Sequence, residues 1–227
     1  NLSIFDEDGI RMVRTRELPI SNLCADAMRI VSDAEIGFVN GGGVRTNLKS
    51  GDITYGDIIN VHPYGNECSV IKATGKNILD HLEYTTYKTK AEYKTTNDLG
   101  VMVPNGEFGG FPCVSGIKFD LDVTKESKVK LDADGLFDKV DGDYRVSNVK
   151  VLKDGEYVDI EMNTYYTVAT TNYIAFENGD GGTVFKECEK VTSGQIDYQN
   201  LIDYIVSLDG KLKDKYSTPE GRINIIS

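Results

Sequence analysis

The chain has 227 residues, and 36 Asp and Glu against 25 Lys and Arg give it a formal net charge of −11 at pH 7. Apolar residues make up 40% of the sequence, which is enough for a hydrophobic core in one large domain or two small ones and excludes a disordered tail. No segment approaches the roughly 20 consecutive apolar residues that span a bilayer. The acidic composition argues against a general nucleic-acid binder, and 2 histidines are too few for most zinc or di-metal hydrolase centres.

The period of apolar residues predicts helices mixed with strands in the first half of the chain. Leu23, Ala27 and Ile30 lie on one face of the first helix, for which Ser21 is the predicted N-cap. In chain order, the predicted elements are a helix at 22–31, a strand at 35–39, a helix at 54–60, a strand at 68–73 and a helix at 74–84. The segment 87–112 has no sustained period, and we expect a long loop or insertion there.

The second half of the chain is rich in predicted strands. Residues 116–123 alternate between apolar and polar types, as in a half-exposed strand, and Asp154-Gly155 is a favoured hairpin turn. Strands are predicted at 113–123, 128–132, 144–153, 157–161 and 165–171, followed by a glycine-rich segment at 178–182, a helix at 198–208 and a strand at 222–226. Without a repeat or a convincing linker, residues 1–227 are expected to form a single compact α+β domain with a mixed β-sheet and flanking helices.

The four cysteines, Cys24, Cys68, Cys113 and Cys188, lie far apart and form no C-x-x-C pair. This spacing excludes a dense disulfide framework and disfavours a structural zinc site. Four buried free thiols are the favoured interpretation. One long-range disulfide stays open as an alternative for an exported protein.

Arginine is concentrated near the N-terminus, where five of the 7 in the chain fall within the first 50 residues: Arg11, Arg14, Arg16, Arg29 and Arg45. The guanidinium group suits bidentate capture of phosphate or carboxylate. Surface ion pairs with neighbouring acids would explain the same cluster. A second signal is therefore needed before the cluster indicates a site.

A glycine-rich turn and an aromatic turn are the first two candidate ligand sites. Asn40-Gly-Gly-Gly-Val-Arg45 follows a predicted strand; its glycines would let backbone amides approach a ligand, and its final Arg supplies charge. Val61-His-Pro-Tyr-Gly65 exposes the ring of Tyr64 at a loop tip, where it could stack on a base or cover the core. His62 is expected at the surface or in a hydrogen bond rather than on a metal, and His81 is expected to pack within its helix.

The third candidate site is the segment from Thr171 to Gly182, where Tyr173 and Phe176 offer aromatic faces and Asp180 offers an acceptor between glycines. The D-x-D-x-D-G spacing of a calcium loop is absent from this segment. The sequence also shows no G-x-S-x-G elbow, no Walker motif and no H-E-x-x-H motif. The groups that would activate water for hydrolysis are not visible in the chain.

Taken together and in this order, the motifs resemble the C-terminal domain of the 5'-nucleotidase and UDP-sugar hydrolase family, which includes 2',3'-cyclic-nucleotide phosphodiesterases. The match runs from about Arg11 to Phe185, and only the ordered set is specific. Its segments are Arg14-Thr-Arg-Glu17, Ser21-Asn-Leu-Cys-Ala-Asp-Ala27, Asn40-Gly-Gly-Gly-Val-Arg45, Gly51-Asp-Ile-Thr-Tyr-Gly-Asp57, Pro63-Tyr-Gly-Asn66, Thr74-Gly75, Leu82-Glu83, Val114-Ser-Gly-Ile117, Asn172-Tyr173 and Gly179-Asp-Gly181.

The resemblance implies a division of labour between two domains. An N-terminal calcineurin-like metallophosphoesterase domain, expected outside this chain, would bind two divalent metal ions and perform the hydrolysis. The C-terminal domain would hold the nucleotide and rotate to deliver its phosphate to those metals. The resemblance thus implies no catalytic residue, metal ligand or cofactor in residues 1–227.

The resemblance also implies a role for individual substrate-binding residues. Two aromatic rings would sandwich the base, a carboxylate would accept from the ribose hydroxyls, and an Asn would place the base or sugar. Arginines would lie on the phosphate and ribose side, beside the glycine loop. The residues in these positions are Tyr64 and Tyr173, Asp180, Asn40, Arg14 and Arg45 with Arg11 as a further phosphate contact, and Gly42 with Gly43.

The sequence departs from the family pattern at the aromatic positions. Tyr64 and Tyr173 stand where Phe is frequent, which preserves stacking and adds a hydroxyl that needs a partner. The spacing between Asn172 and Asp180 is one residue longer than usual, so Phe176 is a rival for the second stacking position.

The leading hypothesis is therefore the nucleotide-binding, specificity-giving domain of an exported, metal-dependent 5'-nucleotidase-type phosphohydrolase, inactive by itself. The alternative is a non-catalytic cell-surface binding or adhesion module that retains the fold. The resemblance implies an extracellular, cell-wall or periplasmic location and a nucleotide or nucleoside as partner, with no nucleic acid and no membrane span. The sequence starts at Asn1 in a strand-like run without a signal peptide, which suggests a piece of a longer protein.

Overall fold

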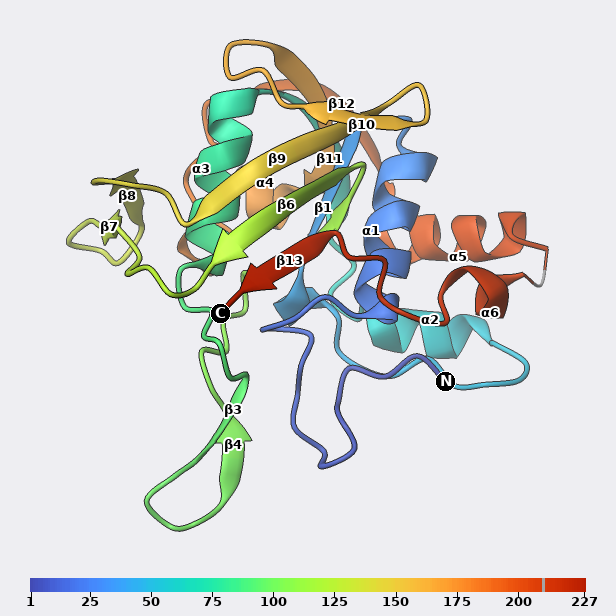
Figure 1. The fold of residues 1–227 in the computed structure, drawn as a ribbon. Coiled ribbons are helices and arrows are strands. Elements are labelled where there is room, and N and C mark those ends of the chain that lie inside the picture. Colours follow the sequence, from blue (N-terminus) through green and yellow to red (C-terminus); the bar gives the residue numbers. More distant parts are fainter. Residues whose placement is uncertain (210) are drawn as a thin grey trace.

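A five-stranded mixed sheet forms the centre of the fold in the computed structural model, which describes residues 1–209 and 211–227 (Figure 1). Its strands run in the order β12-β2-β11-β1-β5. β1 pairs in parallel with β11, and the other neighbours are antiparallel. The bounds are β1 Ile36–Asn40, β2 Glu67–Thr74, β5 Pro112–Ser115, β11 Tyr165–Thr171 and β12 Glu189–Ile196.

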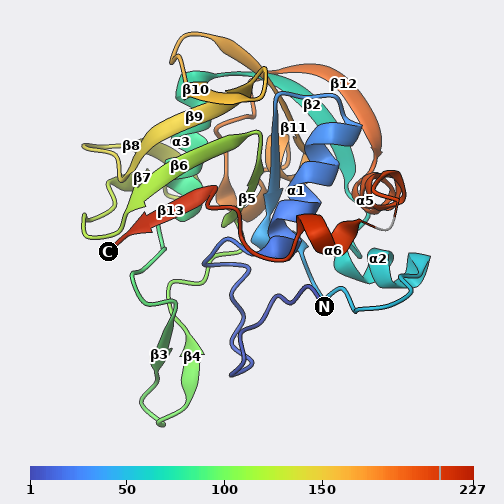
Figure 2. The same ribbon diagram turned by 45° about the vertical axis from the view of Figure 1, so that its right-hand side comes forward.

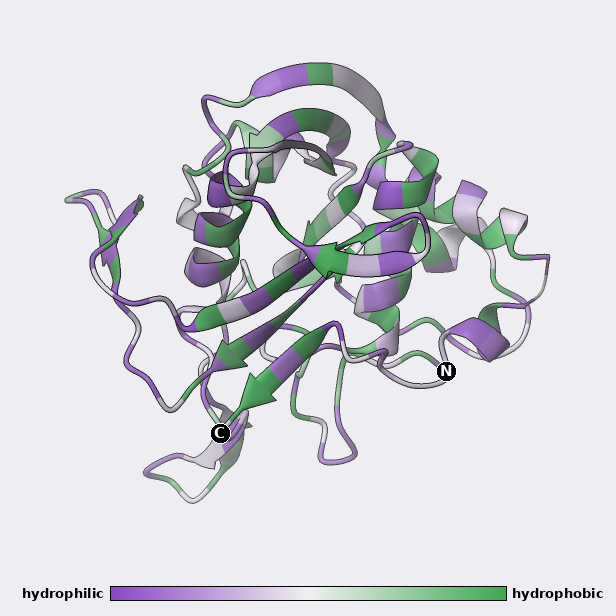
Figure 3. Cartoon of the chain, turned by 45° about the horizontal axis from the view of Figure 1, so that its top comes forward, coloured by the Kyte–Doolittle hydropathy of each residue, from purple (hydrophilic) through white to green (hydrophobic). Residues whose placement is uncertain are grey.

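A second sheet of four strands, in the order β10-β9-β6-β13, lies beside the first and carries the C-terminal strand (Figure 2). β13 runs parallel to β6, and the remaining pairs are antiparallel. Buried and half-buried residues alternate along β6, and hydropathy alternates along these strands in Figure 3. The bounds are β6 Ile117–Asp122, β9 Val146–Lys153, β10 Glu156–Asp159 and β13 Ile223–Ile226.

Helices and two small hairpins complete the described part of the chain. The helices are α1 Pro19–Val31, α2 Tyr55–Val61, α3 Gly75–Thr86, α4 Asn172–Ala175, α5 Asp197–Ser207 and α6 Leu212–Lys215, with short 3-10 turns at Gly41–Gly43 and Gly179–Gly181. The hairpins are β3 Lys94–Thr96 with β4 Met102–Pro104 and β7 Val129–Leu131 with β8 Phe137–Val140. None of the helices described is long and apolar enough to cross a membrane.

The central sheet separates two hydrophobic cores. Val39 and Ala169 face one core, where α1, α2 and α5 pack. Ile36 and Val168 face the other, which is closed by α3 and the four-stranded sheet. Because side chains alternate along a strand, each central strand supplies both cores. The predicted α+β class is confirmed, with the predicted mixed sheet divided into two.

Several predicted boundaries change for local physical reasons. The strand predicted at 113–123 is two strands in different sheets, because Gly116 takes φ of 71° and turns the chain. The segment 87–112 is not wholly loop, since it forms the β3–β4 hairpin. The first helix begins at Pro19, and the Ser21 hydroxyl accepts a hydrogen bond from the Leu18 N–H at 2.9 Å from inside the first turn.

All four cysteines are free thiols, as predicted. Cys24, Cys68 and Cys113 are buried, whereas Cys188 is half-buried, which corrects the prediction of four buried thiols.

Candidate functional site

A cleft of about 820 Å³ opens where the two parallel strands β1 and β11 end. The chain leaves both strands at this edge of the sheet, so the loops that follow them meet there. The cleft is lined by all seven principal predicted site residues together with Gly43: Arg14, Asn40, Gly42, Arg45, Tyr64, Tyr173 and Asp180. Residues separated by up to 166 positions in sequence therefore share one cleft.

The glycines that follow β1 allow the backbone to pack closely, and the amides of two of them are not free to bind a ligand. The N–H groups of Gly41 and Gly42 donate to the carbonyl oxygens of Phe111 and Gly109, each at 2.7 Å. A Cβ on Gly41 would lie 2.2 Å from the Val13 carbonyl oxygen, and one on Gly42 would lie 2.9 Å from that of Gly109. The expectation that these glycines let amides approach a ligand is thus wrong for Gly41 and Gly42, whose amides already have backbone partners.

Asp180 lies in the cleft wall in the left-handed region, with φ of 52°. The Asn40 Nδ2 donates to its Oδ2 at 2.8 Å, and the Tyr84 hydroxyl donates to its carbonyl oxygen at 2.6 Å. Burial raises the pKa of the Asp180 carboxyl, while the hydrogen bond from Asn40 and the charge of Arg14 oppose that rise. The result is a positioned acceptor that takes a proton more readily than an exposed Asp.

The two tyrosines enter the cleft from different loops. Tyr64 follows the C-terminal end of α2 and is 63% exposed, with the Arg45 guanidinium carbon 5.8 Å from its ring centroid. Tyr173 is half-buried in α4, and its hydroxyl accepts a hydrogen bond from the Asp180 N–H at 2.9 Å. Phe176 packs against the core that α3 and the four-stranded sheet close, with Lys190 Nζ 5.4 Å from its ring centroid, and does not line the cleft. Of the two residues considered for the second aromatic position, Tyr173 and Phe176, only Tyr173 lines the cleft.

The N-terminal arginines divide between the cleft and the scaffold. Arg14 lines the cleft and pairs with Glu107 at 3.3 Å, while Arg45 donates to the Gly42 carbonyl oxygen at 3.2 Å. Arg11 lies beside the cleft lining, 3.9 Å from the same Glu107 oxygen. Two others are structural: Arg16 donates to the backbone at Lys90 and Ala91, and Arg29 donates to Ser115.

Sequence reasoning missed five residues that line the cleft: Asn66, Lys88, Glu107, Phe108 and Gly109. Three of them belong to the segment 106–110, which contains three glycines. A Cβ on Gly109 would lie 2.4 Å from the Asp180 Oδ1, so this segment passes directly against the carboxylate. That glycine density was the available signal, and the length of the surrounding loop obscured it.

The histidines lie buried in the protein. His81 of α3 packs between Phe38 and Phe185, and burial lowers its pKa to about 3. His62 lies within hydrogen-bond distance of the Gly43 carbonyl oxygen, 3.2 Å from its Nδ1, and burial lowers its pKa as well. Among the residues that the structure describes, no group of three or more His, Cys, Asp or Glu side chains could hold a metal ion.

The chain matches known proteins over most of its length. A family model described as 5'-nucleotidase, C-terminal domain matches residues 5–187. The trifunctional nucleotide phosphoesterase protein YfkN of Bacillus subtilis (strain 168) is 32% identical over 223 residues, which cover 95% of this chain and 13% of that protein. Cell wall protein Lmo0130 of Listeria monocytogenes is 25% identical over 223 residues, which cover 93% of this chain and 24% of that protein.

Among solved structures, the 5'-nucleotidase precursor from Thermus thermophilus matches with a TM-score of 0.69 and 29% identity, over 95% of this chain and 36% of that one. The chain thus spans well under half the length of each of these relatives. The resemblance predicted from the ordered motifs is confirmed, and the chain belongs to the family of 5'-nucleotidase C-terminal domains.

Proposed function

We propose that this domain binds the nucleotide substrate, and so sets specificity, for a metal-dependent 5'-nucleotidase-type phosphohydrolase. The observation that carries the proposal is the single cleft that holds Tyr64, Tyr173 and Asp180 together with Arg14 and Arg45. Two aromatic rings, a carboxylate and two cationic groups match the base, ribose and phosphate of a nucleotide in turn.

Each group has a distinct part in this proposal. The base lies between Tyr64 and Tyr173, whose rings stack on any base without selecting its edge. Asp180, held by Asn40, accepts from the two vicinal ribose hydroxyls and favours ribose over deoxyribose. The arginines make charge-assisted contacts to phosphate.

Hydrolysis is assigned to a second domain. The described residues offer no group of three or more His, Cys, Asp or Glu side chains for a metal ion, and we therefore place the hydrolytic step in another domain. An N-terminal metallophosphoesterase domain with two divalent metal ions would supply the activated water, and this chain would bind and present the phosphate. The Listeria relative is a protein named for the cell wall, which supports an extracellular, cell-wall or periplasmic location.

Replacing Tyr64 by Ala is expected to weaken adenosine binding by about 1–3 kcal/mol, because one stacking face is lost. Tyr64 is exposed and at a loop tip, so the fold should be unaffected. Isothermal titration calorimetry of the isolated domain with adenosine measures the change. Tyr55→Ala, at a 68% exposed tyrosine outside the cleft lining, is the matched control. Equal affinity in the wild type and Tyr64→Ala would sink the stacking role, and no affinity in any variant would favour a non-catalytic surface-binding module.

A further inference from the structure

An acidic side chain lies among the arginines of the cleft. The Glu107 Oε1 is 3.3 Å from a terminal guanidinium nitrogen of Arg14 and 3.9 Å from one of Arg11. All three side chains are partly shielded, with 22–31% of each exposed. One carboxylate oxygen therefore serves both cations on the side of the cleft that the proposed function gives to phosphate.

The backbone on either side of Glu107 fixes its place. Gly106 takes φ of 71°, and a Cβ there would lie 2.4 Å from the Lys88 carbonyl oxygen. On the other side, the Phe108 N–H donates to the Arg14 carbonyl oxygen at 3.2 Å. The segment that carries Glu107 is thus hydrogen-bonded to the backbone of Arg14, the residue whose side chain Glu107 neutralises.

The charges in the cleft make Glu107 significant for a ligand. Arg14, Arg45 and Lys88 contribute three positive charges to the lining, and Glu107 and Asp180 contribute two carboxylates. Asp180 also feels the charge of Arg14, but it is held by Asn40 and lies on the proposed ribose side, whereas Glu107 is the carboxylate that forms ion pairs with Arg14 and Arg11. A phosphate that approaches Arg14 meets a carboxylate already bound there, and like charges at such distances repel.

We propose that Glu107 is a specificity-determining residue that acts as a built-in counter-ion: it competes with ligand phosphate for Arg14 and Arg11 and so reduces the preference for more highly charged nucleotides. This inference rests on the proposed function, because it concerns the same cleft. A nucleoside has no phosphate and does not meet Glu107. The residue thus lowers the difference in affinity between a nucleoside, its monophosphate and its diphosphate.

The test compares adenosine, AMP and ADP by calorimetric titration of the wild-type domain and Glu107→Gln, which keeps the shape of the side chain and removes its charge. Adenosine affinity should be the same in both. AMP should bind about three- to tenfold more tightly to Glu107→Gln, as expected for removing one partly screened charge, with a larger gain for ADP. Added salt should shrink these gains.

Glu156→Gln, which removes an exposed carboxylate on β10, is the control and should match the wild type with all three ligands. Thermal unfolding confirms that each variant is folded. Unchanged or weaker AMP binding by Glu107→Gln, with adenosine unaffected, would overturn the counter-ion role and leave the proposed function standing. Weakening of adenosine and AMP alike would also overturn it, since Glu107 would then support the cleft as a whole. If wild-type adenosine binding were absent, the proposed function itself would fail.

Discussion

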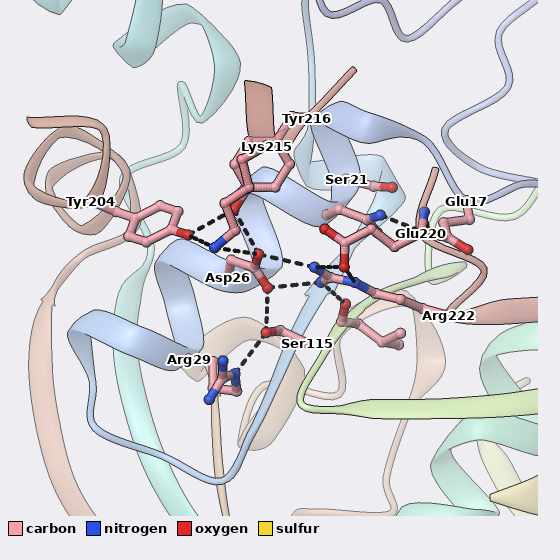
Figure 4. A network of polar contacts seen from close by, with 12 residues as sticks. Glu17, Ser21, Asp26, Arg29, Ser115, Tyr204, Lys215, Tyr216, Glu220 and Arg222 are labelled. Atoms are coloured by element: carbon pink, nitrogen blue, oxygen red, sulfur yellow. Dashed lines mark hydrogen bonds and ion pairs between the residues drawn. The ribbon is translucent and has the colours of Figure 1, made fainter. Parts of the chain in front are cut away.

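Replacing Arg222 by Ala is expected to destabilise the domain by about 3–5 kcal/mol, because it leaves a buried carboxylate without its closest and only buried cationic partner among the described residues. Arg222 precedes β13 and pairs with Asp26 of α1, with its two terminal nitrogens 2.8 and 2.9 Å from the two carboxylate oxygens. Both residues are at most 5% exposed. The hydroxyls of Ser115 and Tyr216 donate to the same carboxylate at 2.5 and 2.6 Å (Figure 4). Once Arg222 is lost, these hydroxyls cannot neutralise the charge, and the remaining cation, Lys215, is 41% exposed and lies 3.7 Å from the carboxylate.

Urea unfolding followed by circular dichroism measures this loss of stability, and Lys94→Ala is the matched control. Lys94 also pairs with carboxylates, at 3.2 Å from Asp6 and 2.6 Å from Asp8, but its side chain is 27% exposed. Pairs in contact with solvent contribute about 0–1 kcal/mol. A loss of less than about 1 kcal/mol in Arg222→Ala would show that water or other groups replace the guanidinium.

The same pair predicts how the domain unfolds in acid. Burial by itself would raise the pKa of Asp26, but the hydrogen bond and charge of Arg222, with the bonds from Ser115 and Tyr216, bring it below the usual value. Since the pKa is lower in the folded state, the stability from Asp26 is present above the unfolded-state pKa and lost as pH falls through the folded-state pKa. Arg222→Ala removes this contribution at neutral pH, so the difference in unfolding free energy between wild type and variant should be largest near neutral pH and should shrink as pH falls through the folded-state pKa of Asp26, which urea unfolding at several pH values measures.

Local pattern was sufficient where a residue's environment depends on its near neighbours in sequence. Leu23 and Ala27 lie in the core, as their helical spacing predicted, and Ile30 is 42% exposed because it falls near the end of α1. Local pattern failed for β12, whose residues are exposed along its whole length, because an edge strand that pairs with β2 on only one side needs no alternation.

Contacts between residues far apart in the sequence could not be predicted from their spacing. Asp26 and Arg222 are 196 positions apart, and nothing in either neighbourhood marks them as partners. The cleft residues were found because their motifs occur in a specific order, which stands in for the missing contact information. Glu107 belonged to no such motif and lay in a segment without period, so its pairing with Arg14 appears only in three dimensions.

Replacing Asp180 by Asn is expected to weaken adenosine binding about 10- to 100-fold, the effect of changing a charged acceptor into a neutral one. The exchange preserves the backbone, since Asn tolerates the φ of 52° that Asp180 adopts. Its amide oxygen can still accept from Asn40. What is removed is the charge and one of the two acceptors proposed for the ribose hydroxyls.

A ligand without those hydroxyls isolates the ribose contact. 2',3'-Dideoxyadenosine should bind the wild type and Asp180→Asn about equally, so that the loss from the substitution and the loss from the ligand are not additive. If dideoxyadenosine were weakened by Asp180→Asn as much as adenosine, Asp180 would act on the cleft rather than on the ribose.

The raised pKa of Asp180 supplies an independent check on the same contact. Because burial raises that pKa, wild-type affinity for adenosine should begin to fall at a higher pH than it would for an exposed carboxylate, as protonation removes an acceptor. Adenosine carries no phosphate, so the ligand's own phosphate titration does not interfere. Asp180→Asn has no carboxyl to titrate and should show no such fall, and a pH profile shared by both proteins would assign the titration to another group.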